Sequence, residues 1–129
     1  MMIYLFEFLL FDIANKYKVK VEKEYQFHPK YKYRFDYAIP EIKVAFEIEG
    51  GIYIRGRHNN PVGYTEDCIK YNLATFLGWK VYRFTTEQVR KGAFMFPTTK
   101  KPRREFVPLS SFLEEIILRK VRREYEGDS

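Results

Sequence analysis

Three acidic residues lie inside apolar, strand-like stretches of this chain of 129 residues. Asp36 is embedded in YRFDYAIP, and Glu47 and Glu49 belong to the run VAFEIE, which contains no Lys or Arg. Burying a carboxylate among Phe, Ile and Val costs free energy unless the group is paired, hydrogen-bonded or bound to a metal. The pattern therefore predicts a divalent-cation site, which points to hydrolytic chemistry on phosphates.

The expected strand geometry brings the three acids close together. Successive side chains of a strand point to opposite faces, so Glu47 and Glu49 share a face, with Cα atoms about 6.6 Å apart. Asp36 lies on the preceding strand, across a turn at Pro40-Glu41. Carboxylate oxygens are hard ligands that suit Mg²⁺ or Mn²⁺. The alternative is that the acids form ion pairs on the same sheet, with Lys32, Arg34 or Lys43.

The periodicity of the apolar residues predicts an α/β fold. Helices are expected at 2–17, from a cap at Thr65 to a stop at Gly78, from Thr86, and from the capping box Ser111-x-x-Glu114. Strands are expected at 19–27, 31–39, 42–49 and 79–84. The order α-β-β-β-α-β plus a C-terminal helix predicts a mixed β-sheet flanked by helices. In that sheet the first three strands form an antiparallel meander and the fourth runs parallel to a neighbour.

Length and composition narrow the class of protein. The chain is expected to form a single domain, 1–129, with a core at 2–90, a basic loop at 91–109 and a C-terminal helix at 110–125. A net charge of +6 and a pI near 9.3 fit a polyanionic partner. Cys68 is the only cysteine, which excludes an internal disulfide and suits a reducing cytoplasm. Glu7 and Asp12 interrupt the apolar N-terminal run before it reaches membrane-spanning length, so we expect a soluble protein with no membrane partner.

The arrangement of these motifs resembles the PD-(D/E)XK nuclease superfamily. The blocks RFDYAIPEIKVAFEIEGG, GRH and EDCIKYNLATFLGWKVYRFTTEQV are most similar to its small very-short-patch-repair-like endonuclease branch, which has phage and bacterial relatives, and the resemblance covers roughly residues 3–90. It implies a restriction-endonuclease-like fold and Mg²⁺- or Mn²⁺-dependent hydrolysis of DNA. It also implies that Asp36 and Glu47 are metal ligands, with the Ile48 backbone carbonyl as a further one.

The chain departs from the superfamily pattern at two positions. Phe35 replaces the usual proline before the aspartate, and Glu49 stands where many members have the catalytic lysine. Two residues are candidates to take over the role of that lysine, although each also has a purely structural interpretation. Lys70 lies on the helix expected after the glycine loop. It is expected either to reach back to the edge of the sheet or to be an ordinary surface lysine. His58 acts as a general base or only hydrogen-bonds within its loop.

Other residues are predicted to serve the site or the DNA surface. Glu49 is a candidate metal ligand or water-activating group, and Glu7 is a secondary candidate because first-helix glutamates of the superfamily often lie near the metal. The residues expected to bind nucleic acid are Arg34, Arg55, Arg57, Lys100 and Lys101. Tyr53 and Tyr64 are candidates for stacking on bases.

Together these features predict a metal-dependent endonuclease that hydrolyses the phosphodiester bonds of duplex or branched DNA. One alternative is a structure-selective Holliday-junction resolvase, for which a homodimer is expected because two cuts must be paired. The final amphipathic helix would then supply the interface. The other alternative is a non-catalytic nucleic-acid-binding module that keeps the nuclease fold, and the absence of a lysine at position 49 favours it.

Overall fold

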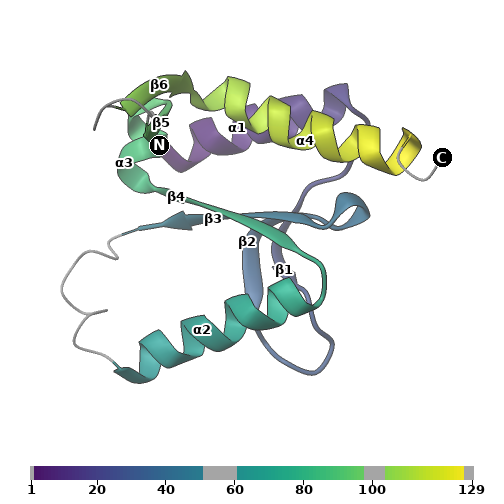
Figure 1. Cartoon of the computed structure of the whole chain (residues 1–129), viewed down its shortest axis with the longest axis vertical. Helices are drawn as coiled ribbons and strands as arrows, with labels where there is room; N and C mark the ends of the chain where they lie inside the picture. Colours follow the sequence, from purple (N-terminus) through teal and green to yellow (C-terminus); the bar gives the residue numbers. More distant parts are fainter. Residues whose placement is uncertain (1, 51–60, 98–103, 127–129) are drawn as a thin grey trace. The chain divides into compact units, whose positions relative to one another are not determined.

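The computed structural model of the protein describes residues 2–50, 61–97 and 104–126 (Figure 1). Its contacts divide the chain into two compact units, each of which is described by itself below. One unit combines both ends of the chain, Met1–Lys20 and Thr86–Ser129, and the other is the continuous segment Val21–Thr85. The continuous segment holds all three acidic residues of the predicted site.

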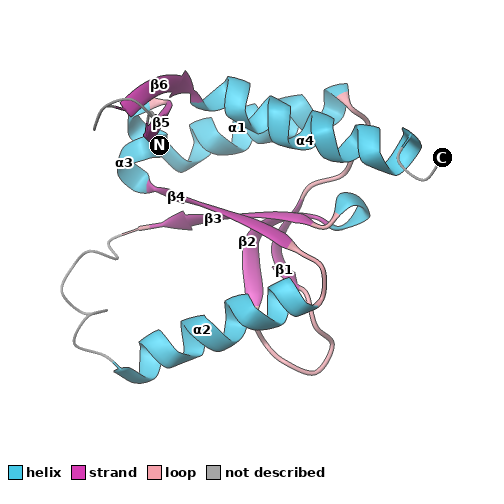
Figure 2. Cartoon of the chain, viewed as in Figure 1, coloured by secondary structure: helices cyan, strands magenta, loops and turns pink. Residues whose placement is uncertain are grey.

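The Val21–Thr85 unit is built on a four-stranded sheet (Figure 2). Its strands, in spatial as well as sequence order, are β1 (Glu22–Gln26), β2 (Arg34–Ile39), β3 (Val44–Glu49) and β4 (Lys80–Thr85). β1, β2 and β3 pair antiparallel, whereas β3 and β4 pair parallel. The predicted mixed α/β class and the predicted directions of the four strands are therefore confirmed.

The chain enters β3 through a short turn and leaves it toward a helix, and the residues at both connections explain why. A short 3₁₀ helix (Pro40–Ile42) joins β2 to β3, and its last turn closes with a hydrogen bond of 3.2 Å from the Lys43 N–H to the Pro40 carbonyl. After β3 the chain continues to α2 (Pro61–Phe76), which provides the crossover needed for a parallel pair. Gly78 ends this helix with a φ of +89°, in the left-handed region that favours glycine.

The predicted cap of α2 at Thr65 is wrong. The helix begins at Pro61, whose fixed φ and missing N–H suit a first helical position. Thr65 lies one turn inside, where its hydroxyl donates a 2.8 Å hydrogen bond to the Pro61 carbonyl. A threonine oxygen bonds to the backbone at either place, so the residue type alone did not locate the end of the helix.

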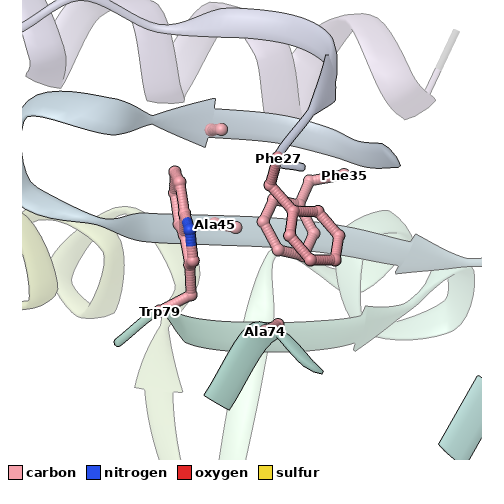
Figure 3. Packing of buried hydrophobic residues seen from close by; sticks show 6 residues of the cluster. Phe27, Phe35, Ala45, Ala74 and Trp79 are labelled. Carbon is pink, nitrogen blue, oxygen red and sulfur yellow. The ribbon is translucent and has the colours of Figure 1, made fainter. Parts of the chain in front are cut away.

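The core between α2 and the sheet combines large aromatic side chains with small alanines (Figure 3). Phe27 and Phe35 stack with ring centroids 4.2 Å apart, and Trp79 lies against Phe35 at 5.1 Å. Ala74 of α2 and Ala45 of β3 are fully buried in the same cluster. These small side chains let the helix approach the sheet closely enough for longer side chains of α2 to reach residues of β3.

The second unit is helical, with one small sheet. Its elements are α1 (Met2–Lys16), α3 (Thr86–Lys91), β5 (Ala93–Pro97), β6 (Arg104–Pro108) and α4 (Leu109–Glu126). α1 packs against both α3 and α4. The predicted first, short and C-terminal helices are confirmed, although α4 begins at Leu109, so that Ser111 lies within its first turn rather than at its cap.

The prediction of a long basic loop at 91–109 is also wrong. The antiparallel pair β5–β6 occupies most of this segment, with Ala93 opposite Pro108 and Pro97 opposite Arg104. Prolines indicated a loop, yet Pro97 and Pro108 each end a strand of a two-stranded sheet, where a missing N–H is tolerated. Within the described ranges, none of the helices has the length and apolar character needed to cross a membrane.

Candidate functional site

Asp36 and Glu47 meet where the hydrogen-bonded ladder between β2 and β3 ends. The last ladder pair is Tyr37 with Phe46, and the two acids follow it on neighbouring strands. Each carboxylate accepts a hydrogen bond from the backbone of the opposite strand. The Ile48 N–H donates to Asp36 Oδ2 at 2.8 Å, and the Asp36 N–H donates to Glu47 Oε2 at 3.0 Å. This crossed pair fixes both carboxylates side by side.

Glu47 is almost completely buried, and α2 supplies the groups that compensate its charge. Only 5% of the residue is exposed. Its Oε1 accepts hydrogen bonds from the Lys70 ammonium and, at 2.7 Å, from the Tyr71 hydroxyl. With the Asp36 N–H on Oε2, three donors satisfy this carboxylate, which is the condition under which a buried charge is tolerated.

Glu49 shares the face of Glu47, as the strand alternation predicted, but it has a different partner. Its carboxylate accepts a hydrogen bond from Arg83 Nε on β4. The Arg83 guanidinium also lies over the Tyr71 ring, 4.3 Å from the centroid, so it contacts residues from both sides of the site. The six residues Asp36, Glu47, Glu49, Lys70, Tyr71 and Arg83 form one connected group, called the acid centre below.

The electrostatics of the acid centre are dominated by burial and by the crowding of carboxylates. Burial raises the pKa of Asp36 to about 6, with further contributions from Glu47 and Glu24, while the Ile48 N–H and Lys70 act in the opposite direction. Burial also raises the pKa of the Tyr71 hydroxyl, as does its hydrogen bond to Glu47. For Arg83, burial alone would lower the pKa, but the hydrogen bond to Glu49 and the nearby charges of Tyr71, Glu49 and Glu47 together outweigh it, and the pKa is raised.

The donor set of the acid centre fits a hard divalent cation. Three carboxylates face two cationic side chains, Lys70 and Arg83, so one negative charge of the group is left over. The Asp36 and Glu47 oxygens are of the type that Mg²⁺ and Mn²⁺ prefer. The Ile48 carbonyl, the predicted further ligand, accepts a 3.1 Å hydrogen bond from the Gly50 N–H, and a carbonyl oxygen has a second lone pair.

The third predicted acidic ligand is arranged differently from the other two. Glu49 is held by Arg83, and the described residues contain no group of three or more His, Cys, Asp or Glu side chains gathered as a metal centre. A cation bound here would therefore use Asp36 and Glu47 as its carboxylate ligands.

The structure brings some of the other predicted residues to the acid centre and leaves others away from it. Lys70 reaches back from α2 to the sheet and contacts Glu47, so it is not an ordinary surface lysine. Arg34 is exposed at the start of β2, two residues before Asp36. Glu7 lies on α1, in the other compact unit. The predicted residues outside the described ranges are Tyr53, Arg55, Arg57, His58, Lys100 and Lys101.

Sequence reasoning missed two members of the acid centre, Tyr71 and Arg83. The proposed ion-pair partners Lys32, Arg34 and Lys43 are not those of the acids, whose partners come from α2 and β4 instead. A signal for Tyr71 existed, because it lies one residue after Lys70 and three before Ala74, on the helix face that turns to the sheet. Arg83 carried no comparable signal, because its place depends on the β3–β4 register, which pairs it with Glu47.

Comparison with known proteins assigns neither a family nor a function to this chain. No protein-family model, no curated protein and no solved structure gives a significant match to this chain. The function is therefore argued from the acid centre itself.

Proposed function

We propose that this protein is a Mg²⁺- or Mn²⁺-dependent endonuclease that hydrolyses DNA phosphodiester bonds. The observation that carries the proposal is the pair of interlocked carboxylates, Asp36 and Glu47, with the Lys70 ammonium against one of them. Fixed carboxylates can hold a cation that polarises a phosphoryl oxygen and activates a water, and a neighbouring ammonium can stabilise the negative charge that develops on the phosphate. The motif order Asp36, Glu47, Glu49 supports the same class by its resemblance to the PD-(D/E)XK superfamily.

Asp36 and Glu47 would hold the cation, with the Ile48 carbonyl as a further ligand. A divalent cation bound to them would supply Lewis-acid stabilisation of the phosphate and a water of lowered pKa. The protein contributes the placement of these oxygens. The backbone N–H groups of Asp36 and Ile48 prevent either carboxylate from turning away, and the Tyr71 hydroxyl restrains Glu47 from the helix side.

Lys70 is the group that we assign to the role of the missing lysine. Its side chain is 16% exposed, so its charge acts in a partly desolvated environment, where electrostatic interactions are stronger than in bulk water. A positive charge next to the bound phosphate stabilises the negative charge that develops during hydrolysis. We retain Glu49 and His58 as candidates for orienting water, although the contact of Glu49 with Arg83 favours a structural role for that acid.

A non-catalytic DNA-binding module is the second candidate, and one observation favours it. Every oxygen of Glu47 already accepts a hydrogen bond, and Glu49 is paired with Arg83, so donors of the protein itself compensate both buried glutamates without a metal. Such a module would bind DNA through Arg34 and other basic residues in a salt-dependent manner. It would not cleave DNA with either cation.

Cleavage assays on matched variants distinguish the two candidates. Asp36→Asn is the informative change, because an amide oxygen still accepts the Ile48 N–H hydrogen bond while the negative charge is lost. Lys70→Met tests the lysine. Glu41→Gln removes an exposed acid of the same unit and serves as the control.

The substrates are duplex, nicked, single-stranded and four-way-junction DNA, each with Mg²⁺, with Mn²⁺ or with EDTA. We expect metal-dependent cleavage by the parent protein and Glu41→Gln, and at least a hundredfold loss in Asp36→Asn, since the site would lose a metal ligand. Thermal unfolding gives a second measurement, because bound metal raises Tm in the parent but not in Asp36→Asn. DNA binding without cleavage and without a metal-induced shift would favour the second candidate.

A further inference from the structure

A row of aromatic side chains leads from the acid centre to the surface of the Val21–Thr85 unit. Phe35 stacks on Phe27 with centroids 4.2 Å apart, and Phe27 lies 6.5 Å from Tyr33 (Figure 3 shows the first pair). Tyr33 is followed by Tyr31 at 6.4 Å, and Tyr31 by His28 at 4.7 Å. These five rings are called the aromatic row below. At its inner end, the Lys70 ammonium lies 5.9 Å from the Phe35 centroid.

The outer end of the aromatic row is held in place by its own turn. The Gln26 side-chain amide donates two hydrogen bonds of 3.0 Å, to the carbonyls of His28 and Tyr31. The Lys30 N–H donates to His28 Nδ1, also at 3.0 Å. These bonds use backbone groups and the imidazole, and none of them involves the Tyr31 ring. The bonds hold the backbone that carries the Tyr31 ring, and His28 packs against one side of that ring, which lowers the entropy cost of binding a ligand on it.

Burial changes along the row from core to solvent. Phe35 is fully buried and Phe27 is 8% exposed, whereas Tyr31 is 47% exposed. Tyr33, between them, anchors the row to α2 through a 2.6 Å hydrogen bond from its hydroxyl to Glu66. Glu66 lies one helical turn before Lys70, so the same helix contacts both the row and the acid centre.

The charged residues of the segment that carries the exposed rings are all basic. The segment 26–35, QFHPKYKYRF, contains Lys30, Lys32 and Arg34 and no acidic residue. All three basic residues are exposed. Aromatic faces between exposed cations are the combination that binds single-stranded nucleic acid, because bases stack on the rings while the cations neutralise phosphates.

We propose that Tyr31, backed by His28, is a stacking platform for an unpaired base of single-stranded DNA, with Lys30, Lys32 and Arg34 contacting the neighbouring phosphates. The inference rests on the proposed function and names the substrate class: DNA with an unpaired segment next to the cleavage site. Arg34 precedes Asp36 by two residues on β2, about 6.6 Å along the strand, so a strand stacked on the platform leads to the acid centre.

Binding measured without metal tests the platform independently of cleavage. Fluorescence anisotropy in EDTA compares a labelled single strand of about 12 nucleotides, within the usual site size, with the same sequence as a blunt duplex. The variants are Tyr31→Ala, Tyr31→Phe, which keeps the ring, and Tyr4→Ala. Tyr4 is a suitable control because it is an exposed tyrosine, 70% exposed, on α1 of the other unit. Thermal unfolding of each variant confirms that it is folded.

We expect the parent to bind the single strand more tightly than the duplex. Tyr31→Ala should weaken single-strand binding on the order of tenfold and leave duplex binding within about twofold, since one base–aromatic stack is lost. Tyr31→Phe and Tyr4→Ala should bind like the parent. Lys32→Gln should reduce the salt slope of single-strand binding by about 0.7, the value for one phosphate contact.

The platform is refuted if a folded Tyr31→Ala variant binds the single strand like the parent, or if it loses single-strand and duplex binding equally. Its failure is distinguishable from failure of the proposed function. Loss of single-strand preference in Tyr31→Ala, together with no metal-dependent cleavage by the parent or with unchanged cleavage in Asp36→Asn, would keep the platform and reject the acid centre as a nuclease site. Metal-dependent cleavage that disappears in Asp36→Asn, with no effect of Tyr31→Ala on binding, would do the reverse.

Discussion

The protein contains the same three-residue contact twice, once exposed and once buried. In the helical unit, consecutive residues Lys16 and Tyr17 both donate to Glu114 Oε2, at 2.5 and 2.6 Å. In the sheet unit, consecutive residues Lys70 and Tyr71 both donate to Glu47 Oε1. The chemistry of the two contacts is identical, so their differences come from their surroundings.

Solvent access separates the two contacts. The side chains of Lys16 and Glu114 are 62% and 35% exposed, whereas those of Lys70 and Glu47 are 16% and 7% exposed. Water and salt screen the first pair, and each of its members can be solvated alone. The members of the second pair cannot, so each depends on the other. Burial thus converts an ordinary surface contact into one in which each charge depends on its partner.

The largest expected difference comes from removing the two glutamates. Glu47→Ala leaves the Lys70 ammonium, the Tyr71 hydroxyl and the Asp36 N–H without an acceptor, so it should lower the free energy of unfolding by about 3–5 kcal/mol. Glu114→Ala should produce little change, since its partners turn to water. Urea denaturation of both variants measures the difference, and equal losses would contradict the comparison.

Removing the lysines should have a smaller effect of the same kind. Lys70→Met leaves Glu47 with two of its three donors. The free energy of unfolding should fall by about 2–3 kcal/mol, the upper part of the range for hydrogen bonds to charged groups. Lys16→Met should unfold at nearly the parent's urea concentration. The same two proteins give an activity control, because only Lys70→Met should lose DNA cleavage.

The tyrosines provide a finer test, because Tyr→Phe removes one hydroxyl and nothing else. Tyr71→Phe should cost about 1.5 kcal/mol, since the hydroxyl donates to a buried carboxylate. Tyr17→Phe removes the corresponding bond to a solvated carboxylate and should change stability much less. If both phenylalanine variants behave alike in urea denaturation, burial is not what distinguishes the two contacts.

The smallest expected effect is a pH dependence that comes from Asp36. Its pKa of about 6 in the folded state lies above the ordinary value of 3.8, so the folded protein holds this proton more tightly than the unfolded chain does. Stability from this group is therefore fully present below about pH 4 and is lost as the pH rises to about 6. Asp36→Asn should remove that decline and, without metal, be more stable at pH 7 by on the order of 1 kcal/mol, allowing for partial exposure.

Urea denaturation of the parent and Asp36→Asn across this pH range isolates the effect, because titration of other groups cancels in the difference. If the difference in the free energy of unfolding between the parent and Asp36→Asn does not change with pH, the pKa of Asp36 is not raised by folding. Adding Mn²⁺ at pH 7 sharpens the test, since a bound cation should stabilise the parent alone.

The local pattern predicted the parts of the site that depend on one element or on neighbouring ones. Alternation along β3 placed Glu47 and Glu49 on one face, and the short turn at Pro40 placed Asp36 beside them. Lys70 was within reach because helix α2 directly follows the loop after β3. The parts that were not predicted depend on longer-range register. Arg83, which lies opposite Glu47 in the register, forms its ion pair with Glu49 only because β4 returns parallel to β3 in one particular alignment.

The errors in the fold have a similar origin. Threonine and serine bond to helix termini and to helix interiors alike, so Thr65 and Ser111 indicated helices whose actual ends lie elsewhere. The composition of 91–108 is typical of a loop, and only the pairing of β5 with β6 makes strands of it. A two-stranded sheet leaves little periodicity in the sequence, because both strands are short and both are edges.

The crossed hydrogen bonds that hold the Asp36 and Glu47 carboxylates also provide a direct spectroscopic readout. The amide protons of Asp36 and Ile48 are hydrogen-bonded to carboxylates rather than to ladder carbonyls. A cation that draws those carboxylates toward itself competes for the same oxygens. Cation binding would then speed hydrogen exchange at these two amides while slowing it in the rest of the sheet, so two backbone positions would report occupancy of the site without any label or substrate.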